Sequence, residues 1–326
     1  MTGAITLDRA LNHYHYGKSE STGAQYRGVD MRGEVILLSR NVKIVGNDTE
    51  NWGCQVLTSD FVESNGEVRF GRTYIDSVEI YNCSQQDTHK AALRFESAEG
   101  SWSRVSNSAI HHGSGLGMEI SLSSSVQIMN NDIFDHVKFG ISVITSRNIT
   151  LDGNWVHGIF ARHLKVESAG DPMAAIASCA HLVGDRCFNV VVTNNVVSSV
   201  EPGGIDTVGY SVMASECGDT QNVVFKNNIA HSIGGNGANI FRNISSKYQR
   251  NCLEASNFIA YKCKAVGIVA NQLTDNVIFR DMILIDNGHS AAPMVGVEGE
   301  DQSIVMNNVV FFGETEARDC QVENVC

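Results

Sequence analysis

One phrase of about two dozen residues recurs along most of the chain, and it limits the folds that the chain can adopt. Each copy has a short run of Val, Ile or Phe, a polar pair that usually contains Asn, a second apolar run, a Gly-rich corner and a further short strand. The copies begin at Val78, Ser103, Val126, Ile149, Val190, Val223, Leu253, Val277 and Ile304. Self-similarity at such a period is typical of a solenoid.

The spacing of the polar pair gives the length of one repeat. Aligned on that pair, the anchors are Ser108, Asn131, Asn154, Asn195, Asn228, Asn257, Met282 and Asn308. The steps from 108 to 131 and from 131 to 154 are 23 residues each, and longer steps in the middle indicate the same unit with inserted loops. We expect insertions near 160–188, with a short helix, and near 209–222 and 242–252.

The residue types in the runs select the kind of solenoid. The runs are too short and too rich in β-branched residues for helices, and the LxxLxL pattern of leucine-rich repeats is missing. At ~3.3 Å per residue, such a unit can wrap once around a narrow core as three strands that pair with the next coil. The sequence therefore predicts an all-β, right-handed parallel β-helix. The recurrent Asn would occupy a corner with left-handed backbone and form a ladder between coils.

Charge and motifs exclude several classes of function. The chain has 24 basic and 36 acidic residues, a net charge of −12, which disfavours nucleic acid and anionic membranes as partners. No apolar run approaches the ~20 residues that span a bilayer, so we expect no membrane-spanning segment. We expect no cofactor and no metal, since phosphate loops, dinucleotide fingerprints and CxxC pairs are missing.

Cysteines and glycosylation sequons favour an oxidising, extracellular setting. The chain has nine cysteines, and four Asn-x-Ser/Thr sequons begin at Asn47, Asn82, Asn148 and Asn243. Disulfides form and persist mainly outside the cytosol, and N-glycans are attached to such sequons in secreted proteins.

The first fifty residues resemble a known family. The strings LNHYHYG and GVDMRGEVILLSRNVKIVG (Leu11–Gly17 and Gly28–Gly46) resemble the end of the glycine-rich domain that precedes β-helix repeats in the fibrocystin and fibrocystin-L family and in related cell-surface hyaluronidases. The similarity continues through WGCQVL (Trp52–Leu57) and AIHHGSGLGMEI (Ala109–Ile120). It implies that residues 1–50 end a glycine-rich β domain continuous with the solenoid, and that 51–326 form the repeats.

The same resemblance implies a segment of a large secreted or membrane-anchored protein. Its partners would be other domains or subunits of an extracellular assembly, with glycans as a further class. The resemblance also implies disulfides, for which the spacing suggests Cys179 with Cys187, and Cys217 with Cys252 or Cys263.

Histidines and an acid recur at equivalent positions of the repeat and form a first candidate site. One column of the alignment holds His111, Phe134, His157, Ser198 and His231, and the next holds His112 and Asp135, with His136 following. Stacked coils could bring these side chains together as a general acid and base or as metal ligands. The alternative is a turn in which stacked polar side chains satisfy backbone groups.

A second candidate site lies near the N-terminus. His15 and Arg32 fall in strings that match the hyaluronidase relatives, where His, Arg and Asp residues of this region are implicated in activity. The alternative is that Arg32, Glu34 and Arg40 form salt bridges that cap the open end of the solenoid.

Two functions remain open at this level. We favour a non-enzymatic extracellular scaffold or recognition module that acts in adhesion, assembly or glycan contact. The alternative is a carbohydrate-active enzyme, either a hyaluronidase-like hydrolase or a polysaccharide lyase. Only three Trp are present, which counts against an extended sugar-binding cleft.

Overall fold

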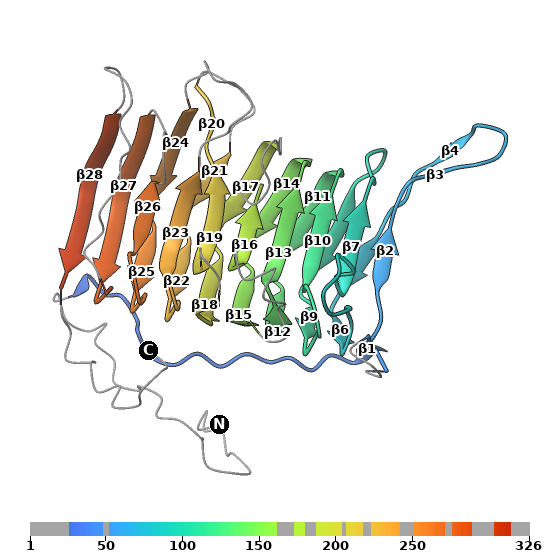
Figure 1. Ribbon diagram of the computed structural model, residues 1–326, viewed down its shortest axis with the longest axis horizontal. Coiled ribbons are helices and arrows are strands. Elements are labelled where there is room, and N and C mark those ends of the chain that lie inside the picture. The colour runs from blue at the N-terminus through green and yellow to red at the C-terminus, as the bar shows by residue number, and fades with distance from the viewer. Residues whose placement is uncertain are drawn as a thin grey trace, which may run out of the picture.

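A computed structural model describes nine stretches of the chain. These are residues 26–47, 52–161, 173–179, 187–203, 207–217, 223–241, 251–270, 276–288 and 303–313. Successive coils lie side by side along the long axis, from β1 and β2 at one end to β28 at the other (Figure 1). The predicted parallel β-helix is confirmed. Among the described residues, no helix has the length and apolar character needed to cross a bilayer.

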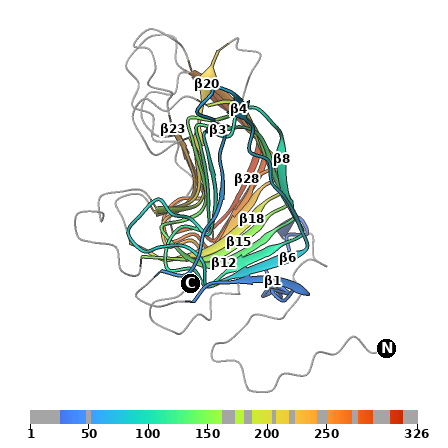
Figure 2. The same ribbon diagram turned by 90° about the vertical axis from the view of Figure 1, so that its right-hand side faces the viewer.

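Most coils contain three strands, one in each of three rows. Figure 2 looks along the axis, and strands of successive coils overlie one another there. The first row comprises β5 (Tyr74–Asp76), β8 (Ser103–Ser106), β11 (Ser124–Met129), β14 (Arg147–Asp152), β17 (Phe188–Thr193), β21 (Val224–Lys226) and β24 (Asn251–Ser256). The second comprises β1 (Val42–Val45), β6 (Val78–Tyr81), β9 (Ala109–His111), β12 (Asp132–Val137), β15 (Trp155–Phe160), β18 (Val196–Val200), β22 (Ile229–His231) and β25 (Ile259–Tyr261).

The third row forms a separate eight-stranded sheet. It comprises β2 (Val56–Thr58), β7 (Leu93–Glu96), β10 (Met118–Ser121), β13 (Phe139–Ile144), β16 (Met173–Ser178), β19 (Thr207–Met213), β23 (Asn236–Phe241) and β26 (Ile268–Ala270). The long strands β27 (Asn276–Ile285) and β28 (Ser303–Phe312) run through the first and second rows together. Antiparallel pairs occur in the hairpin of β3 (Phe61–Val62) with β4 (Val68–Arg69), in β20 (Ser215–Glu216) against β24, and in the isolated bridge between Trp52 and Gln85.

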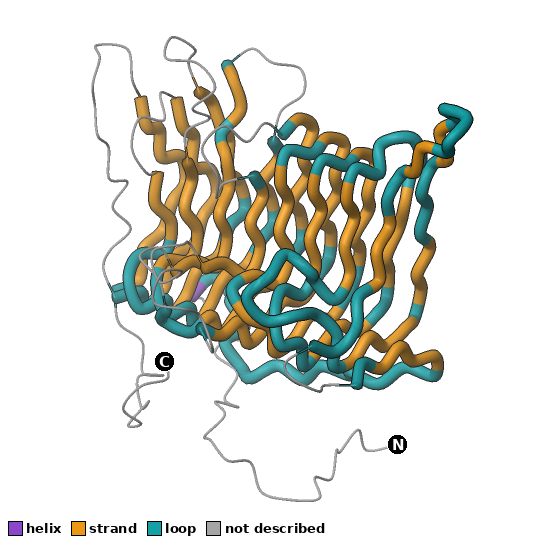
Figure 3. The backbone as a smooth tube through the Cα atoms, turned by 45° about the vertical axis from the view of Figure 1, so that its right-hand side comes forward, coloured by secondary structure: helices purple, strands orange, loops and turns teal. Residues whose placement is uncertain are grey.

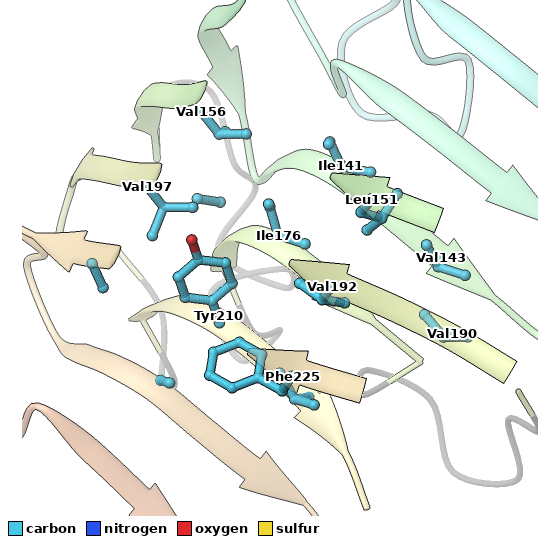
Figure 4. Packing of buried hydrophobic residues seen from close by; sticks show 14 of the residues in the cluster. Ile141, Val143, Leu151, Val156, Ile176, Val190, Val192, Val197, Tyr210 and Phe225 are labelled. Carbon is cyan, nitrogen blue, oxygen red and sulfur yellow. The ribbon is translucent and has the colours of Figure 1, made fainter. Parts of the chain in front are cut away.

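The core is a continuous stack of apolar side chains inside the coils. Within β11, for example, Val126 and Ile128 point inward while Ser125 and Gln127 point outward, as strand alternation requires. Figure 4 shows the Val and Ile layers around Tyr210 and Phe225. Tyr210 is fully buried, and its hydroxyl donates to the backbone oxygen of Asn195 over 2.8 Å. The tube in Figure 3 shows the loops gathered at the corners between rows.

The two adjacent residues of the recurrent polar pair have different structural roles. The first residue has left-handed backbone, with φ of 53° at Asn130 and 56° at Asn194, which Asn tolerates better than most residues. The second residue points inward and is buried. These second residues are Asn131, Asn154, Asn195 and Asn228, and each carboxamide oxygen accepts the backbone N–H of the preceding coil at 2.9–3.1 Å. We call these four residues the inner asparagine ladder. The predicted ladder is confirmed, but the left-handed corner expected for these asparagines is occupied by the residue before each of them.

The expected anchor alignment is wrong by one residue in the last coils. Asn257 and Asn308 have φ of 51° and 55°, so they lie in the outer, left-handed column. Asn257 donates from Nδ2 to Asn227 Oδ1 over 2.9 Å. The inward position of that coil is Phe258, which is fully buried. From this coil onward the inward position holds an apolar side chain in place of an asparagine. The asparagine of the pair occupies the left-handed corner position.

Two expected insertions contain strands of the solenoid. Residues 173–178, placed in the insertion with a short helix, form the buried strand β16, and residues 209–213 belong to β19. Alanine favours helices, but MAAIAS is buried along its whole length, and burial on both faces of a parallel sheet outweighs that preference. Within the three expected insertions, residues 162–172, 180–186, 218–222 and 242–250 lie outside the described residues, and Asn251 and Cys252 begin β24.

Within the described residues, three disulfides fasten the coils. Cys179 pairs with Cys187 and Cys217 pairs with Cys252, both among the pairings expected. The third joins Cys54 to Cys83, and Cys263 is a buried free thiol whose pKa burial raises to about 12. Of the two partners considered for Cys217, the structure therefore selects Cys252.

A non-repeating segment crosses the outside of the second row. Residues 26–41, which we call the N-terminal strap, start beside the last coil and end beside the first coils (Figure 1). At one end the Tyr26 ring packs on Phe312, with centroids 5.4 Å apart. At the other end Arg40 pairs with Asp132 at 2.9 Å. The strap continues into β1, which pairs with β6 in the solenoid. A glycine-rich domain over residues 1–50 stays a prediction.

Candidate functional site

Strand register brings together the side chains that the repeat alignment placed in one column. His111 lies opposite Phe134, which lies opposite His157; Ser198 and His231 follow in the next coils. Tyr81 and Tyr261 extend the same outward-facing line at its two ends. We call these seven residues of the second row the histidine column.

The N-terminal half of the histidine column is a packed group of rings. His111 Nδ1 lies 2.7 Å from His112 Nδ1, and the His111 ring lies 5.2 Å from that of Tyr81. His111 Nε2 is 3.6 Å from a carboxylate oxygen of Glu79, which Lys43 also contacts. Burial, together with the neighbouring His112, lowers the pKa of His111 to about 4. His111 is therefore a neutral, buried ring at physiological pH.

His112 and Asp135 occupy the adjoining corner. Both have left-handed backbone, with φ of 56° and 58°, and His112 Nε2 lies 3.9 Å from Asp135 Oδ2. The side chain of His112 is 41% exposed, so this pair is the most accessible part of the first candidate site. His136, which follows, points into the interior, where its ring nitrogens lie 3.2 and 3.3 Å from the carbonyl oxygens of Ile110 and Gly115. Burial lowers the pKa of His136 to about 4.

The C-terminal half of the column continues the ring stack. The His157 ring stacks on Phe134 at 5.5 Å and its Nδ1 lies 2.7 Å from the Ser198 hydroxyl oxygen. Burial lowers the pKa of His157 as well. His231 stacks on Tyr261 with centroids 4.6 Å apart and ring planes nearly parallel. Its Nε2 lies 2.7 Å from a carboxylate oxygen of Glu34 in the strap.

The N-terminal strap lies over the C-terminal part of this face. Tyr26, Val29 and Met31 are buried against the outward side chains of the last coils, including Tyr261 and Ile285. Glu34 contacts His231, and Arg40 donates to the Asn107 backbone oxygen over 2.9 Å. The strap therefore covers the C-terminal end of the histidine column, at His231 and Tyr261, while Phe134 and His157 are half-buried.

The N-terminal candidate residues separate in the structure. Arg32 pairs with its near neighbour Asp30 at an exposed position. Glu34 and Arg40 lie at different coils along the side of the solenoid, so the expected salt-bridge cluster over its open end does not form. The reason is the extended course of the strap, which spaces these residues along the axis. His15 lies outside the described residues.

Neutral histidines in the fold predict a specific pH dependence of stability. His111 and His136 have pKa values of about 4, below the ~6.5 of an unfolded histidine. The unfolded chain therefore takes up protons first, so stability should fall as the pH drops from ~6.5 towards 4, by up to ~1.4 kcal/mol per pH unit for each residue. Chemical denaturation between about pH 7 and pH 5 measures this slope.

His111→Phe isolates one contribution to that slope. Phenylalanine already occupies the neighbouring position of the column at Phe134, so it suits the site. His112, Glu79 and Lys43 also face position 111, and they remain in the variant. We expect a shallower slope than in the unsubstituted chain. Equal slopes would show that His111 is not held neutral by the fold.

The sequons and a groove lie elsewhere on the surface. Asn47 and Asn148 are exposed, Asn82 is half-buried, and Asn243 lies outside the described residues. A groove of about 310 Å³ runs over the first row, lined by Trp102, Ser125, Gln127, Asn148, Thr150, Asn189 and Val191. In the part of the chain that the structure covers, no three His, Cys, Asp or Glu side chains gather as a set that could hold a metal ion.

Comparison with known proteins agrees with this architecture. The family model described as right handed beta helix region matches residues 12–243. The chain belongs to the right-handed β-helix family. The predicted hand of this β-helix is thereby confirmed.

Relatives of this β-helix protein confirm the resemblance to the fibrocystins. It is 25% identical to fibrocystin-L of Homo sapiens over 89% of this chain, and 27% identical to fibrocystin of Mus musculus over 97%. In both cases the match spans only 7% of the relative's length. Among solved structures, the catalytic unit of a GH87 alpha-1,3-glucanase from Streptomyces thermodiastaticus matches with a TM-score of 0.38 and 12% identity, over 78% of this chain and 50% of that one.

Proposed function

We propose that this chain is a non-enzymatic scaffold and recognition segment of a larger extracellular or cell-surface protein. The observation that carries the proposal is the packing of the histidine column into ring contacts, with the N-terminal strap over its C-terminal end. Its rings pack in two groups on either side of Ser198, and His111 and His231 lie beside Glu79 and beside Glu34 of the strap. These contacts explain the recurring histidines as packing residues. A catalytic acid or base would instead have to be accessible to the polymer that it cleaves.

The construction of the solenoid suits a rigid spacer or docking surface. Each coil pairs with the next in register, the inner asparagine ladder adds buried bonds between coils, and disulfides such as Cys217–Cys252 fasten the chain. Disulfides also favour an oxidising compartment. Because the relatives are far longer than this chain, its partners in adhesion or assembly would include other domains of the same protein.

The second candidate function is a carbohydrate-active enzyme. One observation favours it: His112 and Asp135 lie 3.9 Å apart at a corner, and the His112 side chain is 41% exposed. An imidazole beside a carboxylate can act in general acid–base catalysis. A glycan cleaved at this corner would have to reach it beside the strap.

Incubation with a panel of glycosaminoglycans and plant or algal polysaccharides tests the two functions. We expect no shortening of any polymer, as measured by size-exclusion chromatography. Shortening that is lost in His112→Ala or Asp135→Ala would overturn the scaffold proposal. His89→Ala is the matched control, because His89 is 71% exposed and lies outside the histidine column.

A further inference from the structure

The first-row groove combines an aromatic side chain with amide and hydroxyl groups. Trp102 lies at one end and is 46% exposed. Ser125, Gln127 and Thr150 supply polar groups along the lining. Sugars are recognised by such a combination, since the apolar face of a pyranose packs on an aromatic ring while its hydroxyls form hydrogen bonds.

The Trp102 ring is held in place by its neighbours. It packs edge-on against Tyr74 with centroids 4.7 Å apart. The Arg72 guanidinium lies 5.2 Å from the Tyr74 ring and 5.9 Å from the Trp102 ring. The indole is thus a preformed wall of the groove.

A glycosylation sequon opens into this same groove. Asn148, Ile149 and Thr150 form the sequon, and both Asn148 and Thr150 line the groove while Ile149 is buried in the core. The strand register places Ser124 opposite Arg147 and Val126 opposite Ile149, so Ser125 lies opposite Asn148. It likewise places Val126 opposite Ser103, so the residue beside Ser125 in the preceding coil is Trp102.

Asn148 therefore lies two coils from Trp102, about 10 Å at ~4.8 Å per coil. The side chain of Ser125, which lies between them, is small and leaves space on the outer surface of the strand. One hexosamine attached to the Asn148 side chain would bridge that distance.

The carboxamide of Asn148 is already oriented. Its backbone is left-handed, with φ of 54°, and its Oδ1 accepts a hydrogen bond from Asn189 Nδ2 over 2.9 Å. N-glycosylation leaves that oxygen unchanged as an acceptor, so the bond to Asn189 would fix the direction of an attached sugar. Of the sequons in the described residues, Asn47 and Asn82 are not among the groove-lining residues.

We propose that Asn148 carries an N-linked glycan whose first N-acetylglucosamine lies in the first-row groove against Trp102. In the modification, Asn148 Nδ2 bonds to C1 of the sugar of a polyprenyl-pyrophosphate oligosaccharide. The C1–oxygen bond breaks, the pyrophosphate leaves with the electron pair, and Nδ2 loses one proton. The glycan would be added to the unfolded chain and enclosed as the coils pair. The inference rests on the extracellular placement in the proposed function.

Secretion of the full chain from mammalian cells tests the proposal. Glycopeptide mass spectrometry should find a glycan on Asn148, and Thr150→Val should remove it. Thr150 is an outward strand residue, and valine keeps its shape while deleting the hydroxyl that the sequon requires. An unmodified Asn148 beside glycosylated Asn47 or Asn82 would overturn the proposal, whereas a chain with no glycan at any sequon would also count against the extracellular placement.

The position of the glycan is tested by its rate of release. We expect an endoglycosidase that cleaves the chitobiose core to act on native Trp102→Ala about tenfold faster than on the unsubstituted chain, because the aromatic contact is lost. Trp52→Ala is the matched control, since Trp52 is also exposed but does not line the groove, and it should not alter the rate. Equal rates in the unsubstituted chain and Trp102→Ala would show that the sugar does not lie in the groove.

Discussion

Replacing Asn195 with alanine should lower the free energy of unfolding by at least about 3 kcal/mol. Asn195 is completely buried in the middle of the inner asparagine ladder. Its Oδ1 accepts from the backbone N–H and from Nδ2 of Asn154, and its own Nδ2 donates to Leu151 O and Asn228 Oδ1. Alanine would leave several buried polar groups without these bonds, each of which costs about 1–3 kcal/mol.

The shift in the urea midpoint, measured with the disulfides intact, checks this expectation. Asn194→Gly is the matched control in the adjacent position. Asn194 is exposed and has φ of 56°, a conformation that glycine adopts readily, so water can replace its hydrogen bonds. We expect a loss below about 1 kcal/mol there. Similar losses for the two variants would mean that the inner ladder adds little to stability.

Removing the disulfide between Cys217 and Cys252 should cost about 4 kcal/mol at 25 °C. The two cysteines are 35 residues apart, so the bond closes a long loop of the unfolded chain and lowers its entropy. Replacement of both cysteines by serine, followed by thermal denaturation, measures the loss. Within the folded state the bond holds β20 against β24, because Ser215 lies opposite Cys252.

The bond between Cys179 and Cys187 is the internal comparison. Its separation is only 8 residues, which corresponds to about 2.5 kcal/mol on the same chain-entropy model. The double serine variant at this site should therefore lose less stability. The reverse order would show that local packing, not the length of the closed loop, sets the contribution of each bond.

The repeat could be predicted from sequence because the same residue types return at the positions that pair between coils. A buried amide at Asn131 must meet its partner one coil away, so the same residue type returns at Asn154. The alignment of the repeats is wrong by one residue at Asn257, because an asparagine can occupy either the left-handed corner position or the buried inward position. Only neighbouring core residues, here the buried Phe258, distinguish the two positions.

The strap could not be placed from sequence, because residues 26–41 contain no copy of the repeat. A signal for it was nevertheless present in the last coils. Ile229, Ile259 and Ile283 are apolar at outward positions of the second row, and such a face requires a cover. Without the strap, the histidine column could be aligned correctly from sequence, but the cover over His231 and Tyr261 could not be foreseen.

The adjacency of Tyr26 and Phe312 has a mechanical consequence. Residues 26 and 312 lie together at one end of the solenoid, and the coils between them extend away from that contact (Figure 1). The polypeptide that joins the two residues runs through the strap and every coil. A force that separates residue 26 from residue 312 would therefore break the contact of the two rings first and then peel the strap and β28 from the neighbouring strands.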